Sequence, residues 1–210
     1  MSNRLAEIFD DHELVGKIQR KLPYLFRLAE SESSRAGKVG MQVGSLRERI
    51  LVAMLIYKFG EENVRSEIPI TQPEVDAEVY GTPISIKTIT GGTFSGVKLV
   101  WTVDPEKARE FFDRYMPCCD ILLVQIKWGD VGSFCWIPLS VQRDQFTRMG
   151  RKGYLKLPRQ GTNPRGVEFA KEAMSAMVVS EKTRRIAIRW DVVQPEYDAY
   201  QRWIEYWRSD

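Results

Sequence analysis

The stretch "DILLVQIKW", residues 120–128, limits the possible folds of this chain more than any other segment. Its long apolar run is typical of a strand buried in the centre of a sheet. Further candidate strands lie at 74–80, 84–89, 133–141 and 184–193, and candidate helices lie at 45–60 and 105–116. The sequence therefore predicts an α/β (α+β) fold with a mixed central sheet, flanking helices and a helical N-terminal region.

The N-terminal region is expected to contain two helices before the first strand. Residues 3–29 have a helical pattern, and Pro23 is expected to divide them. Residues 31–44 are rich in small side chains, which predicts a loop. The next helix is then expected to begin at Ser45 and to end at Gly60.

Composition excludes several classes of protein. The chain has 210 residues, 43% of them hydrophobic and 28% charged, which fits a single soluble domain over residues 1–210. No segment is long and apolar enough to span a bilayer, and the N-terminus lacks a signal-peptide core, so we expect a cytoplasmic protein without a membrane partner. The three cysteines, Cys118, Cys119 and Cys135, have no metal-type spacing and are expected to be free thiols.

The stretch "PEVDAEVYGTPISIKT", residues 73–88, carries an unusual set of charges for a hairpin. Three acids, Glu74, Asp76 and Glu78, precede an expected turn at Gly81-Thr82-Pro83, and Lys87 follows it. Because strand side chains alternate, folding the two strands together can bring Asp76 close to Lys87. A surface salt bridge is the alternative, but Lys87 ends an apolar run, where a structural strand would avoid a charge.

A carboxylate and an ammonium group at one sheet edge suit phosphodiester hydrolysis. The carboxylate can bind a divalent metal, and the lysine can hold or polarise a water. Mg²⁺ prefers oxygen ligands and keeps several waters, so one or two protein carboxylates suffice. The only histidine, His12, lies in an acidic helical segment and is expected to be solvated, which disfavours a histidine base.

This arrangement resembles the signature of the PD-(D/E)xK nuclease superfamily, which includes most type II restriction endonucleases. Asp76 matches the first acid of that signature and Lys87 matches the lysine. Two positions depart from it, because Val75 stands where the family has proline and Ser85 stands at the second acid. "DILLVQIK" imitates the motif through Gln125 and Lys127, but its apolar run favours a core strand.

Glu48, in "SLRERILVAML", is the candidate for the missing carboxylate. Family members often carry a glutamate on the helix before the first catalytic strand, and Glu48 falls on the apolar stripe of Leu51, Val52 and Leu55. The alternative is a capping box, in which Glu48 bonds back to the amide of Ser45. The downstream hairpin favours the catalytic role.

The resemblance implies a site-specific, Mg²⁺-dependent endonuclease that cuts double-stranded DNA. It assigns the metal to Asp76, Glu48 and the Ile86 carbonyl, and catalysis to Glu48, Asp76 and Lys87. Because a palindromic site is read most simply by a two-fold symmetric protein, we expect a homodimer that recognises a short palindrome. The chain then divides into a helical N-terminal region and loop (1–44), a catalytic core (45–127) and a DNA-recognition and C-terminal region (128–210). A non-catalytic DNA-binding protein and a repair or recombination nuclease are the alternatives.

DNA contacts are expected mainly between residues 142 and 189, which are rich in Arg and Lys although the net charge is only +3. Arg143, Arg151 and Lys152 suit phosphate, while the loop at 157–166 offers Arg159, Gln160, Asn163 and Arg165 for base edges.

Two other segments have side chains that suit DNA. Met41 can pack in the core or wedge between base pairs, and Gln42 can reach a minor-groove edge. The aromatic stripe of the C-terminal segment, residues 196–210, can stack on bases, but its helical spacing favours packing against the core or a dimer partner.

Overall fold

The computed structural model describes residues 4–35, 41–69, 74–158, 166–192, 195, 198 and 200–208. The helices are α1 (Ala6–Asp10), α2 (His12–Arg35), α3 (Met41–Phe59), α4 (Pro105–Arg114), α5 (Leu139–Tyr154), α6 (Lys171–Val178) and α7 (Gln201–Arg208), with a 3₁₀ turn η1 at Glu61–Asn63. The strands are β1 (Val64–Arg65), β2 (Ala77–Val79), β3 (Thr82–Thr90), β4 (Lys98–Val100), β5 (Asp120–Ile126), β6 (Val131–Ile137), β7 (Leu155–Lys156), β8 (Val167–Phe169) and β9 (Arg184–Arg189). None of the helices in these ranges is long and apolar enough to cross a membrane.

A mixed central sheet organises the molecule, as the apolar run at 120–128 predicted. Its strand order is β1-β2-β3-β5-β6-β9. β3 and β5 are parallel, and every other neighbouring pair is antiparallel. All seven residues of β5 are buried. The predicted fold class is therefore confirmed.

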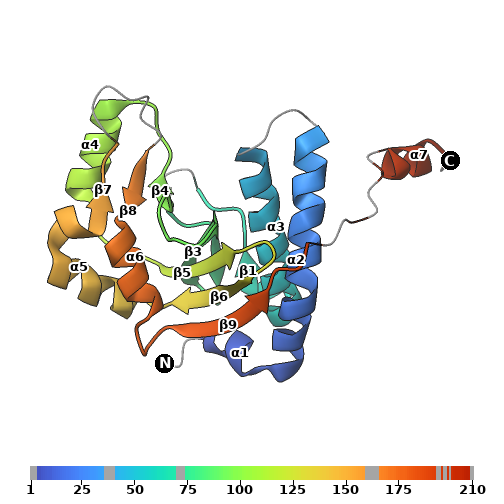
Figure 1. Ribbon diagram of the computed structural model, residues 1–210, viewed down its shortest axis with the longest axis horizontal. Helices are drawn as coiled ribbons and strands as arrows, with labels where there is room; N and C mark the ends of the chain where they lie inside the picture. Colours follow the sequence, from blue (N-terminus) through green and yellow to red (C-terminus); the bar gives the residue numbers. More distant parts are fainter. Residues whose placement is uncertain are drawn as a thin grey trace.

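Helices cover both faces of this sheet (Figure 1), and an apolar core lies on each face. β5 supplies both, because Leu122, Val124 and Ile126 join one core while Ile121 and Leu123 join the other. The first core is completed by α1, α2 and α3. The second is completed by α4, α5, α6 and a small antiparallel sheet of order β4-β8-β7.

The prediction that Pro23 divides the N-terminal helix is wrong. α2 continues through Pro23, and the break lies earlier, at Asp11 between α1 and α2. An interior proline removes one backbone hydrogen bond and costs about 3 kcal/mol. Ile18, Leu22 and Phe26 lie on both sides of Pro23 and are buried in the same core. Their packing offsets the cost of the proline.

The helix expected from Ser45 begins four residues earlier, at Met41. Val43 in its first turn is buried, so the extra turn joins the core. Ser45 therefore lies inside α3 and cannot be its N-cap, which removes the capping-box alternative for Glu48.

An ion-pair network joins α2 to α3 beside the end of β3. Glu30 Oε1 accepts hydrogen bonds from Arg47 and from Trp128 Nε1, the latter at 3.1 Å, and Glu30 Oε2 pairs with Arg27 at 3.0 Å. Arg47 Nη1 also reaches Thr90 Oγ1 at 3.4 Å. Burial lowers the pKa of Arg47 while Glu30 opposes that shift, so Glu30 is the group that compensates the charge of the buried guanidinium.

Replacing Glu30 tests how much the Glu30–Arg47 ion pair contributes to the stability of the fold. We expect Glu30→Ala to lower the free energy of unfolding by about 2 kcal/mol, because Arg47 would stay buried without its carboxylate. Urea denaturation measures the change. Glu32→Ala, at an exposed position of the same helix, is the control and should be nearly neutral. Equal stability of the two variants would contradict a structural role for the network.

Candidate active site

The hairpin of β2 and β3 turns one residue earlier than expected. Tyr80 and Gly81 both have positive φ, 49° and 74°, which is the backbone of a two-residue type I′ turn. Thr82 and Pro83 belong to β3 and pair with Val79 and Glu78. The expected turn at Gly81-Thr82-Pro83 is therefore wrong in its position, while the antiparallel pairing of the two strands is confirmed.

Asp76 lies directly before β2. There its side chain, in place of a backbone carbonyl of β2, accepts hydrogen bonds from β3. Its backbone N–H donates to the Ile84 carbonyl at 2.8 Å. Its Oδ2 accepts from the Ile86 N–H at 2.6 Å and from the Ser85 hydroxyl at 3.3 Å. Ser85 is buried and stands where the resemblance leads us to expect an acid, so in this chain that position holds the aspartate in place.

Lys87 completes the arrangement on β3. Its Nζ lies 3.5 Å from Asp76 Oδ2, and the two side chains are only 15% and 18% exposed. An ion pair this sheltered is not the exposed surface bridge that the sequence left open as the alternative. The predicted proximity of Asp76 and Lys87 is therefore confirmed.

The Ile86 carbonyl faces the same place as Asp76. Ile84 bonds toward β2, and residues two apart in a strand direct their backbone groups to the same neighbour. β2 begins at Ala77, so opposite Ile86 the Asp76 side chain stands where a strand would continue. The Ile86 carbonyl therefore points toward the side of β3 on which the Asp76 carboxylate lies.

Glu48 reaches this edge from α3. Burial raises the pKa of Glu48, the negative charge of Asp76 raises it further, and Lys87 and Arg49 oppose the rise. Glu48 therefore lies within electrostatic reach of Asp76 and Lys87. Two half-buried carboxylates beside each other favour a cation between them.

Glu74, two residues before Asp76, adds a further acid to this region. Burial raises the pKa of Glu74 to about 8, and Lys87 opposes the rise. Its Oε2 lies 3.8 Å from the Cys118 thiol and its carbonyl lies 3.7 Å from the Cys119 thiol. All three cysteines are free, as expected. Cys118 was not recognised as a neighbour of the site, because 42 positions separate it from Asp76 in the chain and only the fold joins them.

The other candidate groups of the sequence have structural roles. Glu78 pairs with Arg65 on β1 at 2.6 Å, away from Lys87. Gln125 is buried and donates to the Gly91 carbonyl at 3.1 Å. His12 is exposed, as expected for a solvated side chain.

The donor set fits a hard cation with few protein ligands. No group of three or more His, Cys, Asp and Glu side chains suited to a metal occurs in the described ranges. Asp76, Glu48 and the Ile86 carbonyl offer only oxygen, which suits Mg²⁺ because this ion retains several waters. The set does not fit Zn²⁺, which favours four ligands that include nitrogen or sulfur.

The candidate DNA contacts are less completely placed. Arg143 and Lys152 are exposed on α5. The pKa of Cys118 is lowered mainly by its hydrogen bond with Cys119, and the charge of Arg143 lowers it slightly further. Arg151 Nη1 instead donates to the Phe112 and Tyr115 carbonyls, at 2.8 and 2.6 Å. Met41 and Gln42 form the first turn of α3, but the directions of their side chains are not described. Arg159, Gln160, Asn163 and Arg165 lie outside the described residues.

The mixed sheet and the paired Asp76 and Lys87, with Glu48 on the preceding helix, define a restriction-endonuclease-like nuclease core. A family model described as restriction endonuclease ThaI matches residues 8–209, so the chain belongs to the ThaI restriction endonuclease family. It is a type II restriction enzyme. A solved structure described as "Restriction endonuclease in complex with substrate DNA" is 51% identical, covers 98% of this chain and 99% of its own, and has a TM-score of 0.90. No curated protein matches the sequence.

Glu48 and Glu78 allow a matched test of the site. Glu48→Gln should leave thermal stability near normal and reduce the cleavage rate by at least about a hundredfold, because the amide cannot supply the carboxylate charge. Glu78→Gln changes an acid of the same hairpin region that pairs with Arg65, and it should cleave normally. Cleavage by the Glu48 variant at the wild-type rate would remove Glu48 from the site.

Arg151 and Lys152 should differ although they are adjacent. Lys152→Ala should lower the slope of log affinity against log salt by about 0.9, the value for one lost phosphate contact. Arg151→Ala should mainly lower the melting temperature, because the carbonyls at the end of α4 lose their donor. Binding titrations across a salt series and thermal denaturation separate the two. An unchanged slope for Lys152→Ala would exclude a phosphate contact there.

Proposed function

We propose that this enzyme is a Mg²⁺-dependent endonuclease that cuts both strands of DNA at a short palindrome, acting as a homodimer in the cytoplasm. The observation that carries the proposal is the sheltered Asp76–Lys87 pair with Glu48 in electrostatic reach. The family membership and the DNA-bound relative favour double-stranded DNA as the substrate. One active site on each subunit matches the two strands of a palindrome.

Asp76 would bind the metal, and hydrogen bonds from β3 fix the position of its carboxylate. Its Oδ2 is engaged by Ile86 N–H, Ser85 and Lys87, so Oδ1 is the atom we assign to the ion. The Ile86 carbonyl would ligate beside it. Glu48 would accept a hydrogen bond from a water at the ion. When bound, Mg²⁺ would polarise the phosphate and lower the pKa of a bound water.

Lys87 would orient the attacking water. Its ammonium group donates only, so it can hold a water oxygen and stabilise negative charge that develops on it. Attack on phosphorus breaks the bond to the 3′ oxygen, which leaves 5′-phosphate and 3′-hydroxyl ends. The Asp76 carboxylate, at 3.5 Å, keeps the ammonium group in place.

Sequence reading is assigned to the segments that flank this site. We assign phosphate contacts to Arg143 and Lys152, and base contacts to the loop that contains Arg159, Gln160, Asn163 and Arg165. The start of α3, with Met41 and Gln42, is assigned to the minor groove. Arg151 has an additional structural role through its contacts with the end of α4, so it is the weakest of the phosphate candidates.

A plasmid assay tests the proposal directly. Wild-type protein with MgCl₂ should produce discrete fragments, and EDTA should abolish them. Random nicking would favour a repair nuclease, and binding without cleavage would favour a non-catalytic DNA-binding protein.

Lys87 separates catalysis from binding. Lys87→Ala should abolish cleavage and largely keep DNA affinity, because the lysine serves the water rather than the duplex. Fragment release measures the first and a Ca²⁺-supported binding titration measures the second. Lys127→Ala, after the end of β5, is the control and should retain cleavage. Parallel loss of affinity and cleavage in Lys87→Ala would instead indicate a phosphate-gripping lysine.

A further inference from the structure

The Glu48 carboxylate is placed by its helix and not by contacts of its own. Within the described ranges no hydrogen bond or ion pair involves this carboxylate, and only the charges of its neighbours act on it. Glu48 lies on α3, whereas Asp76 and Lys87 belong to the hairpin of β2 and β3. The contacts that hold α3 against β3 therefore decide where Glu48 lies relative to the other two residues.

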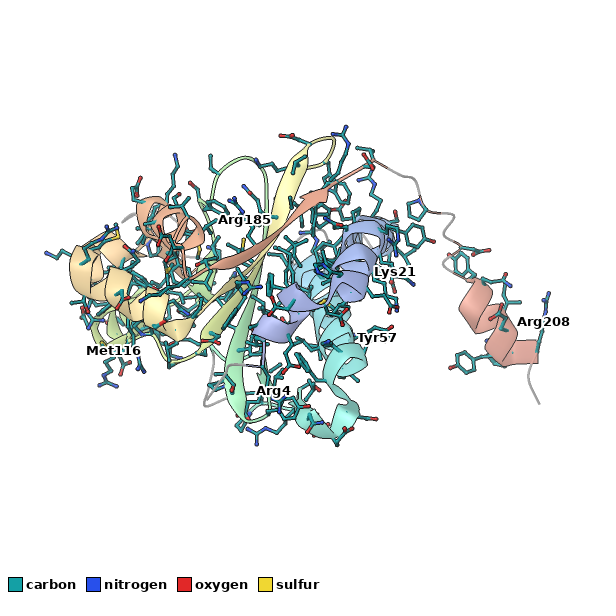
Figure 2. The ribbon with its side chains drawn as sticks, turned by 90° about the horizontal axis from the view of Figure 1, so that it is seen from below. Arg4, Lys21, Tyr57, Met116, Arg185 and Arg208 are labelled. Carbon is teal, nitrogen blue, oxygen red and sulfur yellow. The ribbon has the colours of Figure 1, made fainter. Side chains whose placement is uncertain are left out.

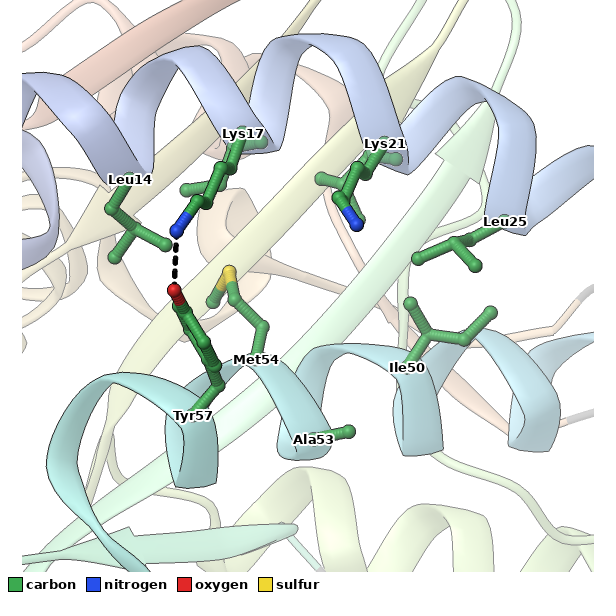
Figure 3. A pocket seen from close by; sticks show the side chains of 10 residues that line it. Leu14, Lys17, Lys21, Leu25, Ile50, Ala53, Met54 and Tyr57 are labelled. Carbon is green, nitrogen blue, oxygen red and sulfur yellow. Dashed lines mark hydrogen bonds between the residues drawn. The ribbon is translucent and has the colours of Figure 1, made fainter.

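Apolar packing between α2 and α3 is incomplete. An open groove of about 310 Å³ separates the two helices along part of their length, and most of its lining is apolar, including Leu25, Ile50 and Met54 (Figure 3). Lys21 and Tyr57 lie on the outer side of the two helices, away from the sheet (Figure 2). Because a void supplies no contacts across it, the spacing of the helices depends more on the bridges at the two ends of the groove.

Charged bridges join the two helices on either side of this groove. At one end Lys58 on α3 pairs with Asp11, directly before α2, at 2.7 Å. At the other end Arg47 on α3 pairs with Glu30 on α2. The Arg47 bridge also reaches β3, because Arg47 Nη1 donates to Thr90 Oγ1 at 3.4 Å. This end of α3 is therefore tied to the strand that carries the candidate catalytic lysine.

The Arg47 bridge has features that a purely stabilising contact would not need. Arg47 is only 9% exposed, and burial lowers its pKa because a buried charge is disfavoured. Its Nε is buried and has no hydrogen-bond partner in the described part of the chain. Apolar side chains of similar volume often stabilise a fold as well as a buried ion pair does, or better. A planar guanidinium, in contrast, bonds its partners only in particular directions, so it fixes an orientation.

We propose that Arg47 is a positioning residue for Glu48. By joining α3 to Glu30 and Thr90, it sets the place of the neighbouring carboxylate relative to Lys87, and it does so without touching the metal or the DNA. Thr90 is only three residues after Lys87 on β3, so few residues separate the two halves of the site along this link. This inference rests on the role of Glu48 in the proposed function and names the residue that supports that role.

Arg47→Met removes the bridge and keeps most of the apolar stem. Glu30 retains its contacts with Arg27 and Trp128, so the variant should stay folded. Its cleavage rate at saturating MgCl₂ should fall at least about tenfold, the lower end of the range for residues that orient metal ligands. Lys58→Met removes the matched bridge at the other end of the groove and should cleave normally.

A double-mutant cycle separates positioning from general stability. Because Arg47 acts through Glu48, Arg47→Met should change the rate by less than about twofold in a Glu48→Gln background. An equal loss in both backgrounds would overturn the proposal. Thr90→Val removes only the contact with β3, at an exposed position, and should also lower the rate. A wild-type rate for Thr90→Val would overturn the link to β3 even if Arg47→Met did not fold.

The Ca²⁺ dependence of DNA binding gives a readout that does not involve cleavage. Arg47→Met should raise the Ca²⁺ concentration that gives half of the maximal DNA affinity, as Glu48→Gln does, and Lys58→Met should leave it unchanged. Wild-type cleavage by Glu48→Gln would overturn the proposed role of Glu48 itself. Loss of cleavage in Glu48→Gln, beside full cleavage and unchanged Ca²⁺ dependence in Arg47→Met, would overturn the positioning role of Arg47 alone.

Discussion

The parallel pairing of β3 with β5 is the constraint on which the rest of the structure depends. β5 is buried along its whole length, and a one-residue shift of its neighbour β3 would turn the buried side chains of β3 to the opposite face of the sheet. That register sets Ile86 opposite Leu122 and Lys87 opposite Leu123. The short β2 then follows from the two-residue turn, and its early end leaves Asp76 to bond the Ile86 N–H with its side chain. The position of the candidate metal site is therefore a consequence of core packing.

The electrostatics of the site follow from the same packing. Asp76 is held by two donors and one ammonium group, all acting on a single oxygen. Glu48 and Glu74 lack comparable partners in the described structure, and burial raises the pKa of each. The candidate site thus has one firmly held carboxylate, Asp76, and two acids, Glu48 and Glu74, whose ionised forms are disfavoured by burial. Binding an ion would relieve that cost and favour the ionised forms.

The sequence predicted the elements that depend on local pattern. The apolar run identified β5, and the alternation of strand side chains brought Asp76 to Lys87, because both signals act within a few residues. It placed the start of α3 and the effect of Pro23 wrongly, because burial of Val43, Ile18 and Phe26 decided them. Three further features could not be predicted from the sequence: the hydrogen bond from Ser85 to Asp76, the closeness of Cys118 to Glu74, and the contacts of Arg151 with α4. Each depends on a partner that the fold brings from a distant segment.

The unbroken helix α3 has a mechanical consequence. Positions 41 and 48 are two turns apart on it, a separation of about 10 Å along one face at about 1.5 Å per residue. The Glu30–Arg47 network fastens this helix to α2 and to the end of β3 at the residue before Glu48. The first turn of α3 and the turn that carries Glu48 therefore belong to one stiff rod, which is anchored beside the candidate site. A duplex docked at position 41 would thus be held at a fixed distance from the candidate catalytic acid.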